Sequence, residues 1–238
     1  MPPPWMKYSA ATGVLALVGW QINSEMFGAP AGPGTDRSDT VKAPSRLSSS
    51  LVKSVIEDCA SRSIGSMSAL NVAGMRSRMR SSAGGGLAAA TVLLARDRSG
   101  PAILAQVLWC PMLDDRNNSY SARQMVGLGV WDASYNGVGW TALLGDAQGG
   151  PDVSPYAAPG RATDLSGLPP TFIDVGSAET FRDEAVAYAS RIWQAGGSAE
   201  LHVWPGGFHG FELLAPQAAI SQTAKAAVEP WLRRTIGI

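Results

Sequence analysis

Residues 81–87 read Ser-Ser-Ala-Gly-Gly-Gly-Leu and open an alanine- and leucine-rich stretch that continues to residue 96. Small residues permit a tight turn and a close backbone approach, while alanine and leucine favour a helix. A serine at the start of such a helix is typical of a nucleophile elbow, where the helix amino terminus favours developing negative charge. The stretch predicts a helix over residues 83–96, with Ser82 as the nucleophile and the Ala83 backbone amide as an oxyanion donor.

One neighbour of Ser82 departs from the elbow pattern. The pattern has glycine two positions before the serine, and Arg80 occupies that position here. A glycine-rich helix entry without a catalytic role is therefore the alternative interpretation. The choice depends on whether the chain also supplies a suitable acid and histidine.

Helix and strand patterns alternate after the elbow. In chain order they predict a strand over residues 103–110, a strand over 171–176, a helix over 181–194, a strand over 200–204 and a helix over 218–234. Pro205-Gly206-Gly207 predicts a turn after the third strand, and residues 117–150 indicate an irregular or helical excursion. Such alternation predicts an α/β fold, with a mostly parallel sheet covered by helices on both faces.

The composition is that of an ordinary globular protein. With 238 residues, 45% of them hydrophobic and 16% charged, the chain is long enough to bury one core. The 19 basic and 19 acidic residues balance, which gives no electrostatic reason to expect nucleic acid or an anionic membrane as a partner. The apolar stretch over residues 13–20 is too short to span a membrane and lacks a cleavage site. We therefore expect a soluble, cytoplasmic protein.

The two cysteines, Cys59 and Cys110, are too few for a disulfide framework. Cys110 ends an apolar run over residues 107–110, which favours a buried, inert thiol over a nucleophile. The sequence shows neither a metal-ligand cluster nor a phosphate-binding loop, so no metal or organic cofactor is expected.

The two histidines fall in different surroundings. His209 lies in Gly206-Gly207-Phe208-His209-Gly210-Phe211, a glycine-rich loop just beyond the third predicted strand. That edge of an α/β sheet is where ligands bind. His202 lies inside the strand over residues 200–204, where a structural role is the better interpretation. The sequence therefore favours His209 as the catalytic base.

Three acidic residues compete to orient that histidine. Glu179 follows the strand over residues 171–176, at the carboxyl end where an orienting acid belongs. Asp183 matches a capping box in Thr180-x-x-Asp183, which gives it a structural role at a helix start. Asp174 lies within the strand and is expected to face a packed layer. Glu179 is the favoured acid, with Asp183 as its alternative.

The candidates occur in the order serine, acid, histidine, which is the α/β-hydrolase order. Their chemistry is coherent as well. The histidine takes the serine proton, the carboxylate holds the imidazole tautomer, and the serine attacks an ester carbonyl.

Residues 82–236 resemble the bacterial hormone-sensitive-lipase-like esterases, family IV of the α/β-hydrolases. The matching segments are Ser82-Ala83-Gly84-Gly85-Gly86-Leu87, Pro111-Met112-Leu113-Asp114-Asp115-Arg116, Leu165-Ser166-Gly167-Leu168-Pro169-Pro170 and His209-Gly210-Phe211. The family has an Asp-Pro-Leu-Arg-Asp stretch whose first residue is the triad acid. Glu179-Thr180-Phe181-Arg182-Asp183 fills that frame, so the resemblance also points to Glu179. The resemblance implies an α/β-hydrolase fold and ester hydrolysis. Because members of the family often dimerise through their last strand and helix, it also implies a homodimer formed through residues 199–234.

The segment before Ser82 does not match the resemblance. No His-Gly-Gly-Gly oxyanion loop is found there; residues 27–32 are a poor substitute, and residues 70–74 are the best candidate for the strand before the serine. A short helix is predicted over residues 51–60. We therefore expect an atypical, partly loop-like region over residues 1–81 and a catalytic portion over residues 82–238. The serine-, arginine- and methionine-rich segment over residues 28–81 also suggests a shifted reading frame as a hypothesis.

Two functions from different classes follow. The first is a carboxylic ester hydrolase that acts on small, short-acyl esters through Ser82, Glu179 and His209 and an acyl-enzyme. The second is a truncated, weakly active or inactive relative that serves as a binding or oligomerising module. Trp131 and Trp140 are candidates either for a substrate pocket or for the core.

Overall fold

The computed structural model describes residues 81–237. Three parallel strands form its sheet in the order β1-β2-β3: β1 (Gln106–Trp109), β2 (Thr171–Ala178) and β3 (Ala199–Phe208). Gln106 pairs with Thr171, and Thr171 pairs with Ala199. The predicted α/β fold with a parallel sheet is confirmed. The predictions for residues 1–80, including the helix over residues 51–60 and the strand over residues 70–74, lie outside the described residues.

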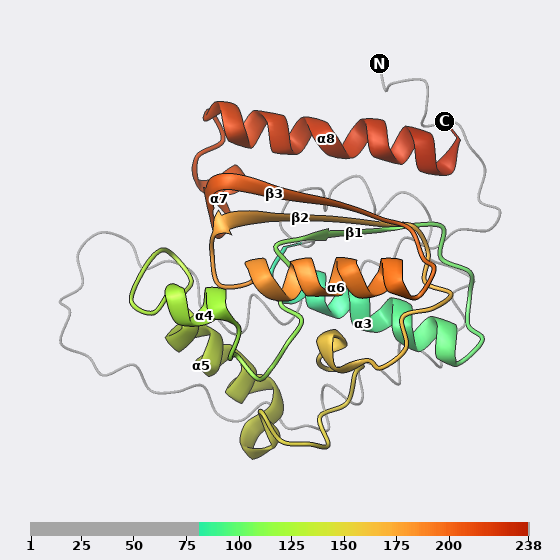
Figure 1. Cartoon of the computed structure of the whole chain (residues 1–238), viewed down its shortest axis with the longest axis horizontal. Coiled ribbons are helices and arrows are strands. Elements are labelled where there is room, and N and C mark those ends of the chain that lie inside the picture. Colours follow the sequence, from blue (N-terminus) through green and yellow to red (C-terminus); the bar gives the residue numbers. More distant parts are fainter. Residues whose placement is uncertain (1–80, 238) are drawn as a thin grey trace, which may run out of the picture.

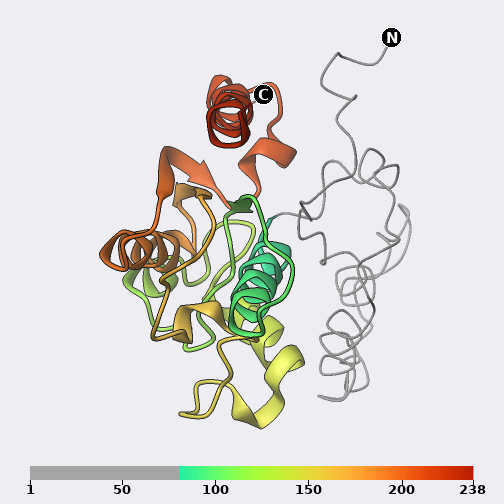
Figure 2. The same ribbon diagram turned by 90° about the vertical axis from the view of Figure 1, so that its right-hand side faces the viewer.

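Helices cover both faces of this sheet (Figure 1). α8 (Ala219–Ile236) lies on one face, while α3 (Ala83–Asp97) and α6 (Arg182–Gln194) lie on the other, as the end-on view also shows (Figure 2). α4 (Tyr120–Gln124), α5 (Ala133–Leu144), η3 (Gly145–Ala147) and η4 (Pro159–Arg161) belong to the excursion between β1 and β2. The short helix α7 (Phe211–Leu214) follows β3. The helices predicted over residues 83–96, 181–194 and 218–234 correspond to α3, α6 and α8.

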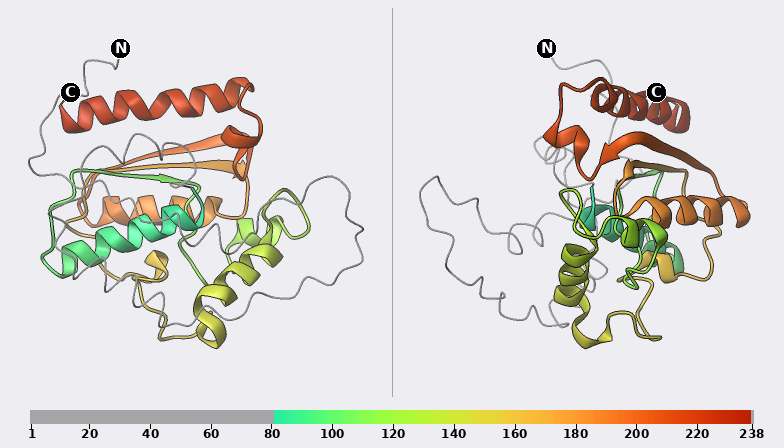
Figure 3. Two further views of the ribbon diagram at one scale, coloured as in Figure 1. Left: turned by 180° about the vertical axis from the view of Figure 1, so that it is seen from behind. Right: turned by 60° about the vertical axis from the view of Figure 1, so that its left-hand side comes forward.

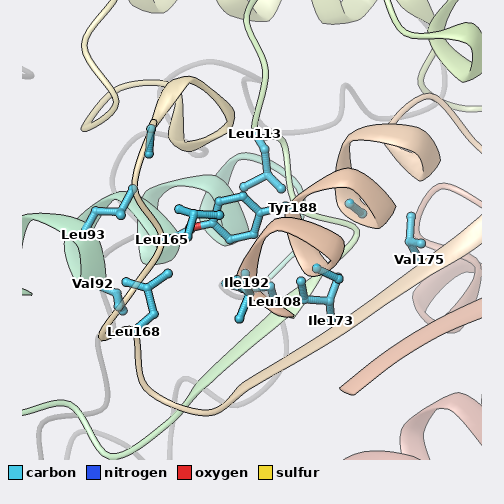
Figure 4. Close-up of a cluster of buried hydrophobic side chains, with 14 of the residues drawn as sticks. Val92, Leu93, Leu108, Leu113, Leu165, Leu168, Ile173, Val175, Tyr188 and Ile192 are labelled. Carbon is cyan, nitrogen blue, oxygen red and sulfur yellow. The ribbon is translucent and has the colours of Figure 1, made fainter. Parts of the chain in front are cut away.

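The larger hydrophobic core fills the space between the sheet and the α3–α6 layer (Figure 4). Val92 and Leu93 of α3 meet Leu108 and Ile173 of the strands, and Tyr188 of α6 is 1% exposed among them. A smaller cluster on the opposite face packs Phe172 of β2 against α8. Because both faces are covered, β1 and β2 are almost entirely buried, whereas β3 is only partly buried.

The predicted turn at Pro205-Gly206-Gly207 is wrong, because β3 continues through these residues to Phe208. The strand passes them by an irregularity: the β2–β3 register shifts between Gly176 and Ala178, and Gly206 has a φ of 75°. A Cβ built on Gly176 would lie 2.1 Å from the Gly207 carbonyl oxygen, so the two backbones touch there. Glycines at this close approach let the strand bulge and resume pairing instead of turning away.

In the excursion between β1 and β2, α4 and α5 lie beyond the carboxyl ends of the strands, and the later part, which contains η4, returns along the α3–α6 layer (Figure 3). Its helices α4 and α5 begin with side-chain caps from Ser119 and Asp132, respectively. Within residues 81–237, no helix is both long enough and apolar enough to cross a membrane.

Candidate active site

Ser82 occupies a strained turn between a strand-like segment and α3. Ser81 bridges Trp109 in parallel, next to β1, and α3 begins directly after Ser82. Ser82 has φ 58° and ψ −124°, a conformation that residues other than glycine rarely adopt. Two hydrogen bonds hold it there, from the Ser82 amide to the Trp109 carbonyl at 3.0 Å and from the Met112 amide to the Ser82 carbonyl at 3.0 Å. Such strain persists only where its surroundings impose it, and it is frequent at active sites.

The glycines after Ser82 let α3 pack closely against the chain that follows β1. A Cβ on Gly86 would lie 2.0 Å from the Met112 carbonyl oxygen, so only glycine fits at that position. This contact is the physical reason for glycine at position 86.

Among residues 81–237, nothing accepts a hydrogen bond from the Ala83 backbone amide, which makes it a candidate anion-binding group. The amides of Ser82, Gly84 and Gly86 donate to carbonyl oxygens of Trp109, Ser81 and Ser82, respectively. No acceptor for the Ala83 N–H lies within residues 81–237. Its position at the first residue of α3 suits the predicted role as an oxyanion donor, which stays a prediction.

Glu179 and His209 lie side by side because the strands that precede them are paired. Ala178 and Phe208 are partners in the β2–β3 ladder, so the residues that follow them meet at the same edge. The His209 Nδ1 and the Glu179 Oε1 are 3.5 Å apart. Glu179 is 1% exposed, and its second oxygen, Oε2, has no hydrogen-bond partner among the described residues. The arrangement can hold an imidazole in one orientation and stabilise its cationic form.

Aromatic rings enclose the histidine. Phe181 meets the His209 ring edge-on at 5.2 Å between ring centroids, and the Trp131 ring lies 6.1 Å away. Trp140, in contrast, is 1% exposed within a core cluster that includes Phe181. Of the two tryptophans proposed for either pocket or core, Trp140 therefore belongs to the core and Trp131 lies beside the candidate base.

Cys110 lies beside the pair of Glu179 and His209. Its sulfur, a carboxylate oxygen of Glu179 and a ring nitrogen of His209 all lie within 4.8 Å of one another. The prediction of a buried thiol is confirmed, since Cys110 is 2% exposed. Burial, reinforced by the negative charge of Glu179, raises the pKa of this thiol well above its ordinary value. The place of Cys110 beside this pair was not predicted from the sequence, although Cys110 directly follows a strand just as Glu179 and His209 do.

The structure does not join Ser82 to His209 directly. Within residues 81–237 no hydrogen bond connects the Ser82 hydroxyl with the imidazole. The two are linked through Cys110, which interacts with the Ser82 backbone and lies next to the Glu179–His209 pair. In enzymes without substrate, catalytic hydrogen bonds are often long and tighten only in the substrate complex.

The alternative acid, Asp183, faces a different partner. Its carboxylate accepts hydrogen bonds from the Ser121 amide at 2.7 Å and from the Arg182 Nε at 2.8 Å. The predicted capping box is wrong: Thr180 donates its hydroxyl to the Trp131 carbonyl instead, and α6 has no side-chain cap. Asp183 therefore contacts the first turn of α4 instead of capping the start of α6.

His202 and Asp174, the other histidine and the third acid weighed from the sequence, each have a partner in β3. His202 lies in β3, stacked on Trp204 at 5.2 Å, and its Nε2 is 2.9 Å from the Glu200 carboxylate. Asp174 is 3% exposed and accepts a hydrogen bond from the Trp204 Nε1 at 2.9 Å. Burial raises the pKa of Asp174 to about 7.

Comparisons with known proteins agree with this architecture. A family model described as the alpha/beta hydrolase fold matches residues 56–213, so the match begins upstream of Ser82. The carboxylesterase NlhH of Mycobacterium tuberculosis is 36% identical over 143 residues, which are 58% of this chain and 44% of that protein. The esterase LipI of the same species is 34% identical over 125 residues, or 51% of this chain and 38% of that one.

Two solved structures extend the comparison. A bacterial heroin esterase superposes with a TM-score of 0.63 at 40% identity, covering 70% of this chain and 55% of its own. An esterase from the bacterial hormone-sensitive lipase family gives a TM-score of 0.60 at 30% identity, with 66% and 52% covered. These similarities confirm the resemblance predicted from residues 82–236. The chain spans about half the length of the relatives it matches.

Proposed function

This chain belongs to the α/β-hydrolase fold family, and on that premise we propose that it is a serine carboxylic ester hydrolase. The pairing of His209 Nδ1 with Glu179 Oε1 at 3.5 Å, next to the strained turn at Ser82, is the observation that carries the proposal. Relatives named carboxylesterase and esterase support it.

In the proposed reaction, Ser82 is the nucleophile. The His209 Nε2 accepts the proton of the Ser82 hydroxyl while the oxygen attacks the ester carbonyl. Glu179 keeps the other imidazole proton on Nδ1 and stabilises the imidazolium that forms. The Ala83 amide donates to the oxyanion of the tetrahedral intermediate.

Collapse of that intermediate completes the first half of the reaction. The carbon–oxygen bond to the alcohol breaks, His209 returns the proton to the departing alcohol, and an acyl group remains on Ser82. A water molecule then loses its proton to His209 and attacks the acyl carbonyl, which releases the acid and restores the serine.

Labelling with a fluorophosphonate tests the nucleophile. The reagent forms a phosphorus–oxygen bond to an activated serine and releases fluoride, so mass spectrometry should find one adduct, on the peptide with Ser82. Ser82→Ala should abolish the adduct, whereas Ser81→Ala, which removes the adjacent hydroxyl, should retain it. A folded chain that never reacts would instead favour the truncated, inactive relative that serves as a binding module.

The acyl preference is a separate proposal. We infer a small, short-acyl ester as the substrate, with Trp131 as one wall of the pocket because its ring is 6.1 Å from that of His209. On nitrophenyl esters, kcat/KM should then be highest for acetate or butyrate and fall as the acyl chain lengthens. Equal or rising kcat/KM with long acyl chains would contradict this substrate class while leaving the triad intact.

A further inference from the structure

The three strands deliver three potential metal ligands to one point. β1 ends at Trp109, β2 at Ala178 and β3 at Phe208, and the next residue after each is Cys110, Glu179 or His209. The sulfur, oxygen and nitrogen atoms of these side chains lie within 4.8 Å of one another. We propose that Cys110, Glu179 and His209 form an inhibitory binding site for a borderline-soft divalent cation, with Zn²⁺ as its natural occupant.

The spacing suits a shared ion. At 3.5 Å, the distance between His209 Nδ1 and Glu179 Oε1 is long for a charge-assisted hydrogen bond. Two ligands that each lie about 2.0–2.2 Å from one tetrahedral ion are separated by about 3.3–3.6 Å. The pair therefore already has the separation that a zinc ion would require. The Cys110 sulfur lies within 4.8 Å of a ring nitrogen of His209 and of a carboxylate oxygen of Glu179, so it would move closer to the pair to become the third ligand.

The electrostatic surroundings favour a cation at this point. Glu179 is 1% exposed, and its Oε2 has no hydrogen-bond partner among residues 81–237. A buried oxygen without a partner is costly, and a metal ion bound to the Glu179 carboxylate would remove that cost.

The donor set selects the kind of ion. A thiolate, an imidazole and a carboxylate suit Zn²⁺ or Cd²⁺, whereas Mg²⁺ and Ca²⁺ prefer oxygen ligands alone. Three protein ligands leave a fourth tetrahedral position for water. Binding requires the Cys110 thiol to release its proton to solvent.

The inhibitory part of the inference rests on the proposed function. A cation on Nδ1 of His209 moves the imidazole proton to Nε2. That nitrogen can then no longer accept the proton of Ser82, and Glu179 no longer orients the ring. Ester hydrolysis should therefore stop while the ion is bound and return when a chelator removes it.

Cadmium titration tests the site without any need for activity. In a Cys59→Ser background, which removes the other thiol of the chain, Cd²⁺ should produce a thiolate-to-metal absorption band that saturates at one ion per chain. Cys110→Ser should abolish the band. His209→Gln and Glu179→Gln should weaken binding by about 100-fold or more, because even the loss of an outer partner of a ligand typically costs about 10–100-fold.

His202→Gln is the matched control, because His202 also pairs with a glutamate but lies in β3 outside the cluster. It should bind Cd²⁺ like the parent. An unchanged band in Cys110→Ser, or unchanged affinity in His209→Gln, would overturn the proposed site. Circular dichroism of each variant confirms that the chain is folded.

Inhibition by Zn²⁺ is measured separately on an ester substrate. It should follow the same occupancy as metal binding, be reversed by a chelator, and require at least about tenfold more Zn²⁺ in Cys110→Ser. Equal inhibition of the parent and of Cys110→Ser would contradict an inhibitory role for this site. A chain that binds Cd²⁺ through Cys110 but hydrolyses no ester would retain the metal site and contradict the proposed function instead.

Discussion

Glu179 and Asp183 are four positions apart, yet their side chains have different partners. Glu179 faces His209, whereas Asp183 holds the Ser121 amide at the start of α4. The sequence predicted that Glu179 directly follows a strand, and it does so in the structure, at the end of β2. It assigned the wrong contact to Asp183, because a capping box is a local pattern and the partner in α4 is distant in sequence.

Exchange of each acid for its amide separates the two roles. Glu179→Gln should lower kcat by about 10³–10⁴-fold, since the amide no longer holds the required imidazole tautomer. Asp183→Asn should leave kcat within a few-fold and reduce the free energy of unfolding by about 1–3 kcal/mol, through the weakened bond to Ser121. Steady-state kinetics and urea denaturation give both numbers. Equal losses of kcat in the two variants would argue against Glu179 as the orienting acid.

Cys110 shows how a residue-level interpretation can be correct and incomplete. Its apolar neighbours correctly predicted burial, with 2% of the residue exposed. Its position directly after a strand carried the further information that it lies at the carboxyl edge of the sheet, where Glu179 and His209 were expected. The sequence alone does not show which strands are neighbours, so the contact between the three side chains could not be derived from it.

At the scale of elements, a buried ion pair secures the segment that leads away from β1. Asp115, which is 0% exposed, accepts hydrogen bonds from the Arg161 Nε at 2.7 Å and Nη2 at 3.0 Å. Arg161 ends η4, and the Gly149 amide also donates to Asp115, at 2.7 Å. The pair thus joins three separate parts of the excursion between β1 and β2.

Removal of the arginine should therefore be costly. Arg161→Ala leaves the Asp115 carboxylate buried without its cation and should lower the free energy of unfolding by about 3–5 kcal/mol. Arg233→Ala breaks an exposed pair with Glu229 in α8 and should cost about 0.5 kcal/mol or less. Urea denaturation of both variants checks the difference. Similar losses would mean that burial of Asp115 does not strengthen this pair.

Helices and strands were predicted best where the local sequence pattern was strongest. α3, α6 and α8 were predicted to within a few residues, because each has a continuous pattern and a clear end. β3 was predicted too short, because Pro205-Gly206-Gly207 has the composition of a turn. Its continuation depends on the backbone of Gly207 meeting that of Gly176 in β2, a tertiary contact that no local pattern contains.

At the scale of the whole molecule, parallel pairing brings separate segments to one edge. The order β1-β2-β3 places the residues after each strand together, and α3 begins at the same edge. The alternation of helices and strands was enough to predict that Glu179 and His209 meet at one edge of the sheet, because parallel strands all end on one side. The number of strands in the sheet and the segments that cover the site could not be predicted from this local alternation. The chain spans about half the length of its relatives.

Buried carboxyl groups also give the whole molecule a pH-dependent stability. Burial raises the pKa values of Asp174, Glu184 and Glu212, and that of Asp174 reaches about 7. In the folded chain Asp174 therefore keeps its proton at pH values where the unfolded chain has lost it. The stabilisation is fully present below the ordinary pKa of 3.8 and is lost as the pH rises through about 7.

Asp174→Asn isolates this contribution, because the amide oxygen can still accept the hydrogen bond from the Trp204 Nε1. Between about pH 5 and about pH 8, the parent chain should lose up to about 2–3 kcal/mol more of its free energy of unfolding than the variant does. Urea denaturation of both proteins at the two pH values measures that difference. If parent and variant lose the same free energy, the Asp174 carboxyl is already ionised at pH 5, and Glu184 and Glu212 must account for any dependence that remains. If the free energy of unfolding depends on pH in the parent but not in the variant, the Asp174 carboxyl alone accounts for the pH dependence of stability in this range.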